Sequence, residues 1–400
     1  MSRSNTSDLL AAADDLSEQM IGIRREIHRN PELGLELPKT QERLLEELAA
    51  AGLQGTPGKD LSSITAVIEG DHDGPTMLLR ADMDALPLHE DAEISFKSLD
   101  DDRMHACGHD LHVSMLVGAA KLLQARRRDI KGRVLLMFQP GEEGFNGARH
   151  MLNEGLLDVA GTIDRAFAIH VSAAAPTGVI ALKGGPQMAS SDNFTIVVRG
   201  RGGHASAPHY AADPIPVACE IVQALQVMIT RQIDAFDPSV VTVGQIKAGT
   251  TSNVIPETAH ILGTIRAVSE RTRSKVHDSL RRVAENIAAA HDQVAEVEVI
   301  LGYSVTVNNE DVANDTLRVA AELFTPARSV RMPHPVMGSE DWSEVLQKVP
   351  GSMAFLGATP HNQNPFTVAG NHSNKVFFDE AAMPTGAALY AAMALDHLAR

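Results

Sequence analysis

The densest group of chemically active side chains lies at residues 105–112, which read His-Ala-Cys-Gly-His-Asp-Leu-His. The segment holds three imidazoles, one carboxylate and one of only two cysteines in the chain. A thiolate and a neutral imidazole are the ligands that hold borderline-soft divalent ions such as Zn²⁺. Because the side chains of one short stretch cannot all converge on one ion, a metal site here must recruit ligands from distant segments.

Candidate partners follow apolar runs elsewhere in the chain. The run Val134–Phe138 predicts a buried parallel strand, and the carboxylates of Glu142–Glu143 follow it closely. A second run, Ala166–Ile169, leads to His170 in the same way, and His372 supplies one more imidazole near the C-terminus. Open α/β sheets place their chemistry at the carboxyl ends of strands, so we expect these side chains to meet at one edge of a sheet.

Each of these residues alone has an ordinary explanation. Most single histidines lie on the surface or in satisfied core positions, and most glutamate pairs are solvated. The cysteine–histidine cluster by itself fits a metal site and coincidence about equally, and His105 and His112 fit a structural role as well as a functional one. Found together, in this order and at strand ends, the residues favour a metal-dependent enzyme.

The composition fits a globular enzyme with two domains. At 400 residues the chain is longer than a single core usually supports, and 44% of its residues are hydrophobic. Its formal net charge of -16, from 35 basic and 51 acidic residues, argues against a nucleic-acid or anionic-membrane partner. The sequence has no apolar run of about 18 residues, and residues 1–16 lack the basic head and apolar stretch of a secretory signal. We therefore expect a cytoplasmic protein.

Cysteine usage is consistent with the same compartment. Cys107 and Cys219 are far apart in the sequence and make no disulfide framework, which suits a reducing environment. Cys219 lies in an apolar helical stretch, so we expect it to be a core residue.

The first 185 residues alternate between helical and strand patterns. Helix is expected from Leu9 to about Ala51 with a turn at Asn30–Gly34, strands at Ile64–Glu69 and Met77–Arg80, and a helix from about Leu111. This alternation predicts a largely parallel sheet covered by helices. The same texture returns after Tyr303 and ends in a helix at Pro384–Leu398. We therefore assign residues 1–185 and 303–400 to one discontinuous catalytic domain.

Between these parts, residues 186–302 predict an inserted domain. The pattern is strand, helix, strand, strand, helix, strand, which is the order of the ferredoxin-like split unit. These elements are expected at Phe194–Val198, Pro214–Ile229, Val240–Ile246, Ala259–Ala267, Arg271–Ala290 and Val294–Leu301. An insertion of this size, on the order of 115 residues, is a normal domain.

The motifs of both parts resemble a known family. They look like those of the aminoacylase, hippurate hydrolase and auxin-conjugate hydrolase branch of the dinuclear metallopeptidase-like amidohydrolases, over nearly the whole chain. The motifs are Asp82–Pro87, His105–Asp110, Gln139–Gly144, Gly203–His204, Asn253–Pro256 and Asn371–His372. The resemblance implies an α/β fold, with a mostly parallel-sheet, aminopeptidase-like catalytic domain and an inserted ferredoxin-like α+β lid or dimerisation domain. It also implies a homodimer or a higher homo-oligomer.

The resemblance further implies two divalent ions per chain, Mn²⁺ or Zn²⁺, with Co²⁺ as another option. Cys107 would bridge the ions, with His109 and Glu143 on one side and with His170 and His372 completing the site. Glu142 would be the general base. The wider family generally bridges with aspartate and has a histidine where Asp82 stands, so the role of Asp82 stays open.

The chemistry is also reasonable from the residues themselves. Two metal ions about 3.5 to 4 Å apart lower the pKa of a shared water and polarise the scissile carbonyl. Glu142 can take the proton of that water and return it to the leaving amine, while its neighbour Glu143 binds metal. Asp84 and Asp110 are better suited to orienting the ligating imidazoles.

The inserted domain carries a second group of polar residues. A glycine-dense loop, Arg199–Ser206, follows a strand but lacks the spacing and lysine of a Walker phosphate cradle. The resemblance implies that His204 reaches an active site, in its own or the partner subunit, and stabilises the oxyanion. Asn253 and Arg266 resemble the family's clamp for the substrate carboxylate, a task that suits a bidentate guanidinium. Arg266 also fits a structural place in a strand.

The function we expect is hydrolysis of the amide bond of a small-molecule N-acyl amino acid to a free amino acid and a carboxylic acid. A dipeptidase- or carboxypeptidase-type enzyme could use the same site. A hydrolase with Cys107 as nucleophile, activated by His105 or His109, leaves the distant carboxylates and histidines unexplained. A binding module that holds metal without turnover has no need of Glu142. Neither the acyl group nor the native metal follows from the sequence.

Overall fold

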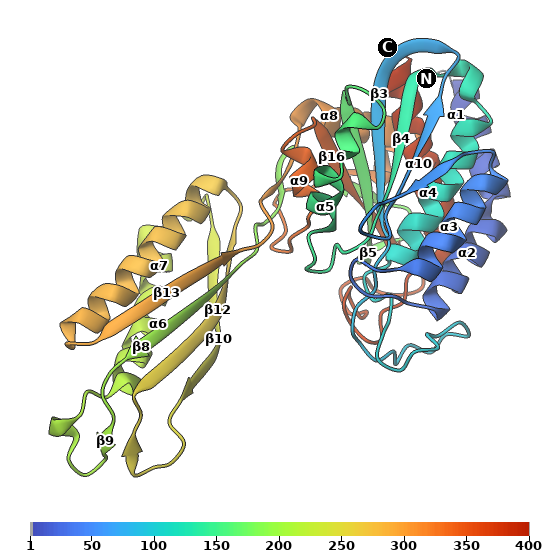
Figure 1. Ribbon diagram of the computed structural model, residues 1–400. Helices are drawn as coiled ribbons and strands as arrows, with labels where there is room; N and C mark the ends of the chain where they lie inside the picture. Colours follow the sequence, from blue (N-terminus) through green and yellow to red (C-terminus); the bar gives the residue numbers. More distant parts are fainter. Residues whose placement is uncertain (1–2, 400) are drawn as a thin grey trace. The chain divides into compact units, whose positions relative to one another are not determined.

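The computed structural model describes residues 3–399, which divide into two compact units (Figure 1). Unit 1 takes residues 3–185, 307–334 and 344–399, and unit 2 takes residues 186–306 and 335–343. The segment 335–343 therefore clusters with unit 2, although the sequence pattern assigned it to the range 303–400. Each unit has its own hydrophobic core.

Unit 1 is built on a sheet of eight strands in the order β1-β2-β4-β3-β5-β16-β6-β15. The bounds are β1 (Gly55–Pro57), β2 (Ile64–Glu69), β3 (His72–Asp82), β4 (Lys131–Gln139), β5 (Arg165–Pro176), β6 (Ile180–Leu182), β15 (Ser329–Arg331) and β16 (Gly351–Thr359). The central strands β4, β3, β5 and β16 are mutually parallel, while β1, β2 and β6 each run antiparallel to a neighbour. Strands buried on both faces explain continuous apolar runs such as Val134–Phe138. The mostly parallel sheet expected from the sequence is confirmed.

Helices pack against this sheet. They are α1 (Arg3–Asp15), α2 (Ser17–Arg29), α3 (Pro38–Ala50), α4 (His109–Gln124), α5 (Gly147–Asn153), α8 (Glu310–Leu323), α9 (Ser343–Leu346) and α10 (Met383–Leu398). Helix α4 lies against α2, α10 and β3, and 14 of its 16 residues are buried. It packs closely on α10 because Gly386 has no side chain; a Cβ there would lie 2.1 Å from the Met115 sulfur. The N-terminus of α4, which carries predicted ligands, is therefore held by the core.

Unit 2 has a four-stranded antiparallel sheet in the order β10-β12-β8-β13 (Figure 1). Its elements are β8 (Asp192–Arg199), α6 (Pro214–Gln232), β10 (Ser239–Ala248), β12 (Thr258–Ala267), α7 (Glu270–Ala290) and β13 (Val294–Leu301). A separate ribbon pairs β9 (Gly203–His204) with β11 (Val254–Ile255), and the short strands β7 (Gly185–Met188) and β14 (Thr306–Asn308) lie near the chain boundaries of the units. The order of strands and helices is that of the split unit predicted from the sequence.

One face of the unit 2 sheet is covered by α6 and α7. Phe194, Ile196 and Val198 of β8 are buried against these helices, and the residues between them are more exposed, as a half-buried strand requires. Helix α6 begins at Pro214, as the sequence predicts, and α7 begins at Glu270, one residue before the predicted Arg271. Asp213 caps α6 and Ser269 caps α7 by accepting hydrogen bonds from backbone N–H groups.

Cys219 on α6 is exposed, so the expectation that it is a core residue is wrong. The helix turns Val217, Ala218 and Ile221 toward the sheet and leaves Cys219 outside.

Asp192 is fully buried and accepts hydrogen bonds from Arg273 at 2.6 and 2.9 Å. This ion pair joins α7 to the first strand of the unit.

Candidate metal centre

The five predicted metal ligands converge in unit 1. The Cys107 sulfur lies 3.4 Å from His170 Nε2 and 3.2 Å from His372 Nε2, and His372 Nε2 lies 3.2 Å from Glu143 Oε1. Several trios of side chains offer ligand atoms within 4.8 Å of one another, and two of these trios contain Cys107. These two are Cys107, His109 and His170, and Cys107, Glu143 and His372. This arrangement suits two adjacent ions that share the thiolate, and His109 belongs both to a trio with His170 and to another with Glu142 and Glu143.

Cys107 and His109 are placed by the loop that enters α4. Between them Gly108 has a φ of +88°, and a Cβ there would lie 2.4 Å from a methyl group of Val171. Only glycine fits, because the backbone is left-handed and the strand is too close for a side chain. His109 Nδ1 donates to the backbone carbonyl of Asp84 at 2.8 Å. That bond leaves Nε2 as the lone-pair nitrogen, directed into the site.

Glu142 and Glu143 lie on a turn beyond β4. The carboxylate of Asp84 accepts the backbone N–H of Glu142 on one oxygen and that of Glu143 on the other, each at 3.0 Å. Gly141 has a φ of +72°, which lets the chain turn back over Asp84. Asp84 therefore orients both glutamates and, through its carbonyl, the His109 ring. Glu142 is buried, and its carboxylate lies within 4.8 Å of ligand atoms of His109 and Glu143.

His170 lies on β5 just beyond the last residue of this strand that pairs with β3. Strand β3 pairs with β5 only as far as Ala168, so the next backbone groups on that side need other partners. The Val171 N–H donates to His112 Nε2 at 2.8 Å. His170 is therefore not at the strand end that the sequence pattern predicted, because β5 continues to Pro176 beside β16.

His112 and Asp82 form a buried hydrogen-bonded pair that contacts the backbone next to His170. Since His112 Nε2 accepts a backbone N–H, its Nδ1 carries the proton and donates to Asp82 at 2.5 Å. Asp82 also accepts from Arg80 at 2.7 Å. Burial opposes the charge on Asp82, but the positive charge of Arg80 and the nearby histidines outweigh it and hold the pKa of this carboxyl well below its ordinary value. Both ring nitrogens of His112 are thus engaged, and its role in this arrangement is structural.

His372 sits on an unusual backbone beside Asn371. Its φ is +67°, which is uncommon for a residue other than glycine, and its N–H donates to the carbonyl of Ala106 at 2.8 Å. The Asn371 side chain bonds to three backbone groups: the carbonyls of Cys107 (3.3 Å) and Val171 (3.0 Å), and the N–H of Ala173 (3.0 Å). Asn371 thus ties together the segments that carry three ligands. In the sequence its only signal is that it precedes His372.

Asp110 does not orient a predicted ligand. Its carboxylate accepts from Arg24 Nε at 2.7 Å and from His28 Nδ1 at 2.8 Å. Burial opposes its charge, but Arg24 and His28 hold its pKa well below the ordinary range. His105 lies nearby with both ring nitrogens unpartnered among residues 3–399, and burial lowers its pKa to about 3. The expected role of Asp110 is corrected to that of an anchor between α4 and α2.

Burial and mutual contacts shift the pKa values of the candidate ligands. Burial and the negative charge of Glu143 raise the pKa of the Cys107 thiol. Hydrogen bonds with Cys107 and Glu143 raise the pKa of His372 to about 10, and burial with the neighbouring His112 lowers that of His170 to about 3. One thiol, three imidazoles and a carboxylate converge, and His109 Nε2 is buried without a hydrogen-bond partner among residues 3–399. This donor set fits divalent metal ions.

The predicted residues of unit 2 form two groups. His204 and Asn253 lie together on the β9–β11 ribbon, where Val254 is opposite His204. Both are exposed, and His204 Nδ1 accepts from Ser206, which directs Nε2 outward. The ribbon strand β11 immediately precedes the N-terminal end of β12, whereas Arg266 lies near the C-terminal end of β12. Arg266 donates a hydrogen bond to Ser339 at 2.8 Å. At about 3.3 Å per residue, Thr258 and Arg266 are roughly 26 Å apart along this strand. Unit 2 of one chain does not bring Asn253 and Arg266 together.

Comparison with known proteins agrees with this site. The family described as Peptidase family M20/M25/M40 matches residues 78–396. The chain belongs to this family. A protein named Thermostable carboxypeptidase 2, from Saccharolobus solfataricus, is 39% identical over 95% of this chain and 96% of its own length. IAA-amino acid hydrolase ILR1-like 2 of Arabidopsis thaliana is 37% identical over 97% of this chain and 87% of its own.

A solved structure supports both the fold and the metal expectation. The YXEP protein of Bacillus subtilis, described as a dinuclear metal binding peptidase from the M20 family, superposes with a TM-score of 0.84 at 32% identity, over 96% of this chain and 99% of its own. This chain is therefore a hydrolase of the M20 family, and the resemblance stated from its motifs is confirmed. Among residues 3–399 no helix is long and apolar enough to cross a membrane.

Proposed function

We propose that this M20 hydrolase cleaves the amide bond of N-acyl amino acids and releases a free amino acid and a carboxylic acid. The observation that carries the proposal is the pair of ligand trios that share Cys107, with the buried carboxylate of Glu142 beside them. A relative at 37% identity is named as a hydrolase of IAA-amino acids, which are conjugates of the same general kind. Both cysteines are free thiols, and we include a cytoplasmic location in the proposal.

The proposed site holds two divalent ions of the Mn²⁺, Zn²⁺ or Co²⁺ type. Cys107, His109 and His170 would hold one ion, and Cys107, Glu143 and His372 the other. When bound, such ions lower the pKa of a water and polarise the scissile carbonyl. Soft thiolate with imidazole and carboxylate accepts any of the three metals, so supply in the cell decides among them.

Glu142 is the proposed general base. Asp84 fixes its backbone N–H, so its carboxylate has a defined direction toward His109 and Glu143. It takes a proton from the attacking water and gives it to the nitrogen of the leaving amine. A positioned base of this kind contributes about 10²- to 10⁴-fold to the rate. The Glu142→Gln variant should keep its metal and lose at least about a hundredfold in kcat on N-acyl amino acids; kcat within a few-fold of wild type would contradict the assignment.

We further propose that the enzyme acts as a homodimer in which one chain supplies His204 and Asn253 and the other supplies Arg266. The support is the separation along β12, since a clamp for one small carboxylate cannot span roughly 26 Å. His204 would donate a hydrogen bond to the oxyanion, and such donors lower the barrier by about 2.7 to 4 kcal/mol. Asn253 and Arg266 would bind the substrate carboxylate.

Mixed dimers test this arrangement. His204→Ala and Arg266→Ala should each be nearly inactive alone. If the two residues come from different chains, a mixed dimer has one site with both substitutions and one with neither, so a statistical mixture should recover about a quarter of wild-type activity. If both come from one chain, every site in the mixture carries a defect and no activity returns.

A second function on the same site is supported by the relative named Thermostable carboxypeptidase 2. A carboxypeptidase would cleave peptides with a free amino terminus as well as the N-acylated forms. Matched pairs, such as glycyl-phenylalanine and acetyl-phenylalanine, distinguish the two activities.

The cysteine-nucleophile alternative is weakened because burial and Glu143 raise the pKa of Cys107, whereas a nucleophilic cysteine needs a lowered pKa.

A further inference from the structure

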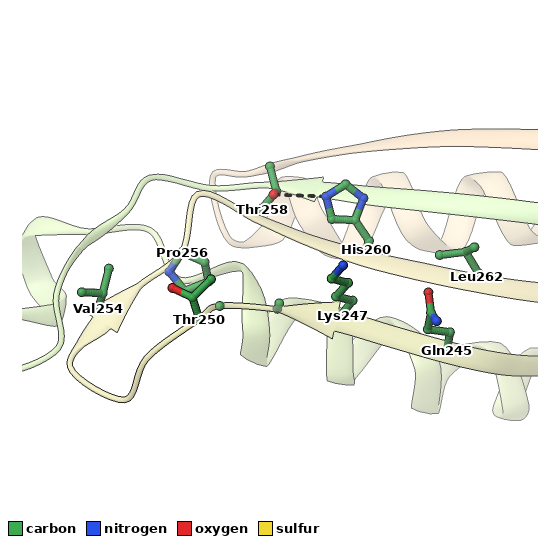
Figure 2. A pocket seen from close by; sticks show the side chains of 10 residues that line it. Gln245, Lys247, Thr250, Val254, Pro256, Thr258, His260 and Leu262 are labelled. Carbon is green, nitrogen blue, oxygen red and sulfur yellow. Dashed lines mark hydrogen bonds between the residues drawn. The ribbon is translucent and has the colours of Figure 1, made fainter.

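The exposed face of the unit 2 sheet carries a cavity of about 460 Å³ between β10 and β12. We call it the β10–β12 cavity. Figure 2 shows the side chains that line it, which include Gln245, Lys247, Val254, Pro256, His260 and Leu262. Its volume is within the range of small-molecule sites. It lies on the face that α6 and α7 leave uncovered, since Lys247, His260 and Leu262 are all exposed.

The charge of the cavity is unusual for this chain. The protein has a formal net charge of -16, yet none of the ten lining residues is Asp or Glu. Lys247 and His260 are directly opposite each other on the two strands, and their side chains lie side by side in Figure 2. Lys247 makes no ion pair within the described part of the chain. Two hydrogen-bond donors, one of them a lysine, with no carboxylate among the lining residues favour an anion.

The donors of the cavity are directed by the strands. His260 Nε2 lies 3.2 Å from the Thr258 hydroxyl, and when that hydroxyl donates, Nδ1 carries the proton and can donate to a ligand. Gln245 is opposite Leu262 and adds an amide on the same strand as Lys247. A carboxylate placed between Lys247 and His260 would therefore receive hydrogen bonds from both strands, and bonds of this type are the stronger ones.

The rest of the lining is apolar. Leu262 and Val254 are exposed by 40% and 51%, and Pro256 lies beside them. This surface would cover the hydrocarbon part of a ligand whose charged end is at Lys247. Val254 also follows Asn253 and pairs with His204. The cavity thus adjoins the ribbon that carries two of the residues expected to meet substrate.

We propose that the β10–β12 cavity binds a small amphipathic carboxylate, with Lys247 and His260 at the carboxylate and the apolar residues against its hydrocarbon body. Two molecules of the proposed reaction have this chemistry: the N-acyl amino acid and the carboxylic acid that is released. Only this choice of source rests on the proposed function. The binding itself is independent of turnover.

Calorimetric titration of the full-length protein with benzoate and with uncharged benzamide tests the site, because benzoate has no amide bond and benzamide lacks the amino-acid carboxylate of the proposed substrates. Benzoate should bind more tightly than benzamide. The affinity for benzoate should be lower at high salt than at low salt, because salt screens its charge. Lys247→Met should weaken benzoate roughly three- to tenfold, the effect of one partly exposed charge-assisted bond, and leave benzamide unchanged. His260→Gln should weaken benzoate as well. The matched control is Lys348→Met, which removes an exposed lysine of unit 1. Equal affinity of benzoate for the Lys247→Met and Lys348→Met variants overturns the proposal.

Kinetics with N-benzoylglycine then identify the source. If the substrate occupies the cavity, Lys247→Met raises KM and leaves kcat near the wild-type value. If the released acid occupies it, KM is unchanged and inhibition by benzoate weakens. A protein that binds benzoate through Lys247 but hydrolyses no N-acyl amino acid would contradict the proposed function and leave the binding site intact.

Discussion

Asn371 offers a test of how the metal ligands are held. Its side chain makes hydrogen bonds of 3.0 Å to Val171 and Ala173 and a longer one of 3.3 Å to Cys107. Replacement by alanine removes all three. At about 1 kcal/mol for each of the two shorter bonds, the loss is about 2 kcal/mol. If the whole loss falls on the metal-bound state, the dissociation constant for metal rises about thirtyfold, since 1.4 kcal/mol corresponds to about tenfold.

The assay is a competition titration of Zn²⁺ between the metal-free protein and a chromophoric chelator. We expect Asn371→Ala to weaken binding by about ten- to thirtyfold, within the 10- to 100-fold range typical of residues that orient ligands. Asn374→Ala is the matched control, because Asn374 lies in the same loop and its side chain bonds to Asp91 at the surface. Asn371→Asp should be at least as harmful as Asn371→Ala, since it sets a carboxylate against two carbonyls. If Asn371→Ala binds Zn²⁺ as tightly as Asn374→Ala does, the positioning role is refuted.

Three further outcomes follow from the structure. Asp192→Asn should lower the free energy of unfolding of unit 2 by about 3 to 5 kcal/mol at pH 7, the usual cost of removing one member of a buried ion pair, as measured by urea denaturation. Burial opposes the charge on Asp192, but Arg273 and His277 hold its pKa well below the ordinary value; the stabilisation is therefore present above about pH 4 and is lost as the pH falls through the lowered pKa, so an equal effect of the substitution at low pH would contradict this. His204→Ala should lower kcat more than metal affinity, and the opposite order would exclude an oxyanion role. Asp84→Asn should lower both kcat and metal affinity, because one of its two oxygens becomes an N–H donor that faces a backbone N–H. Unchanged metal content and turnover would show that other contacts hold Glu142 and Glu143 in place.

Local signals in the sequence were sufficient for unit 2. The period-two pattern of Phe194–Val198 and the helical pattern that begins at Pro214 depend on neighbours a few residues away, so they can be recognised without knowing the fold. Unit 1 shows the limit of such patterns. Strand β5 continues to Pro176 through a run of alanines, because β16 pairs with it as far as Thr359. A strand that is formed by its neighbour leaves little mark in its own residues.

The convergence of the five candidate ligands could be predicted from residue type, but the residues that hold them in place could not. Cysteine, histidine and glutamate can be recognised as candidate ligands by residue type alone, whereas Asn371 acts through backbone groups of segments about 200 or more residues away. Asp110 likewise bonds to Arg24, which is 86 residues away. Which buried charges pair is decided by how α2 and α4 pack, and no spacing in the sequence encodes it. The position of Cys219 was missed for the same reason, since an apolar helix can still have an outward side.

Metal content and amide hydrolysis, measured on the same sample of the protein, test whether this enzyme is metal-dependent. We expect about two divalent ions per chain, as in other two-metal hydrolytic sites, and hydrolysis of N-acyl amino acids that is lost on chelation and restored by Mn²⁺ or Zn²⁺. Hydrolysis that survives complete removal of metal would contradict this expectation and point to Cys107 as nucleophile. About two bound ions without turnover of any N-acyl amino acid or peptide would contradict it in the other direction and indicate a binding protein.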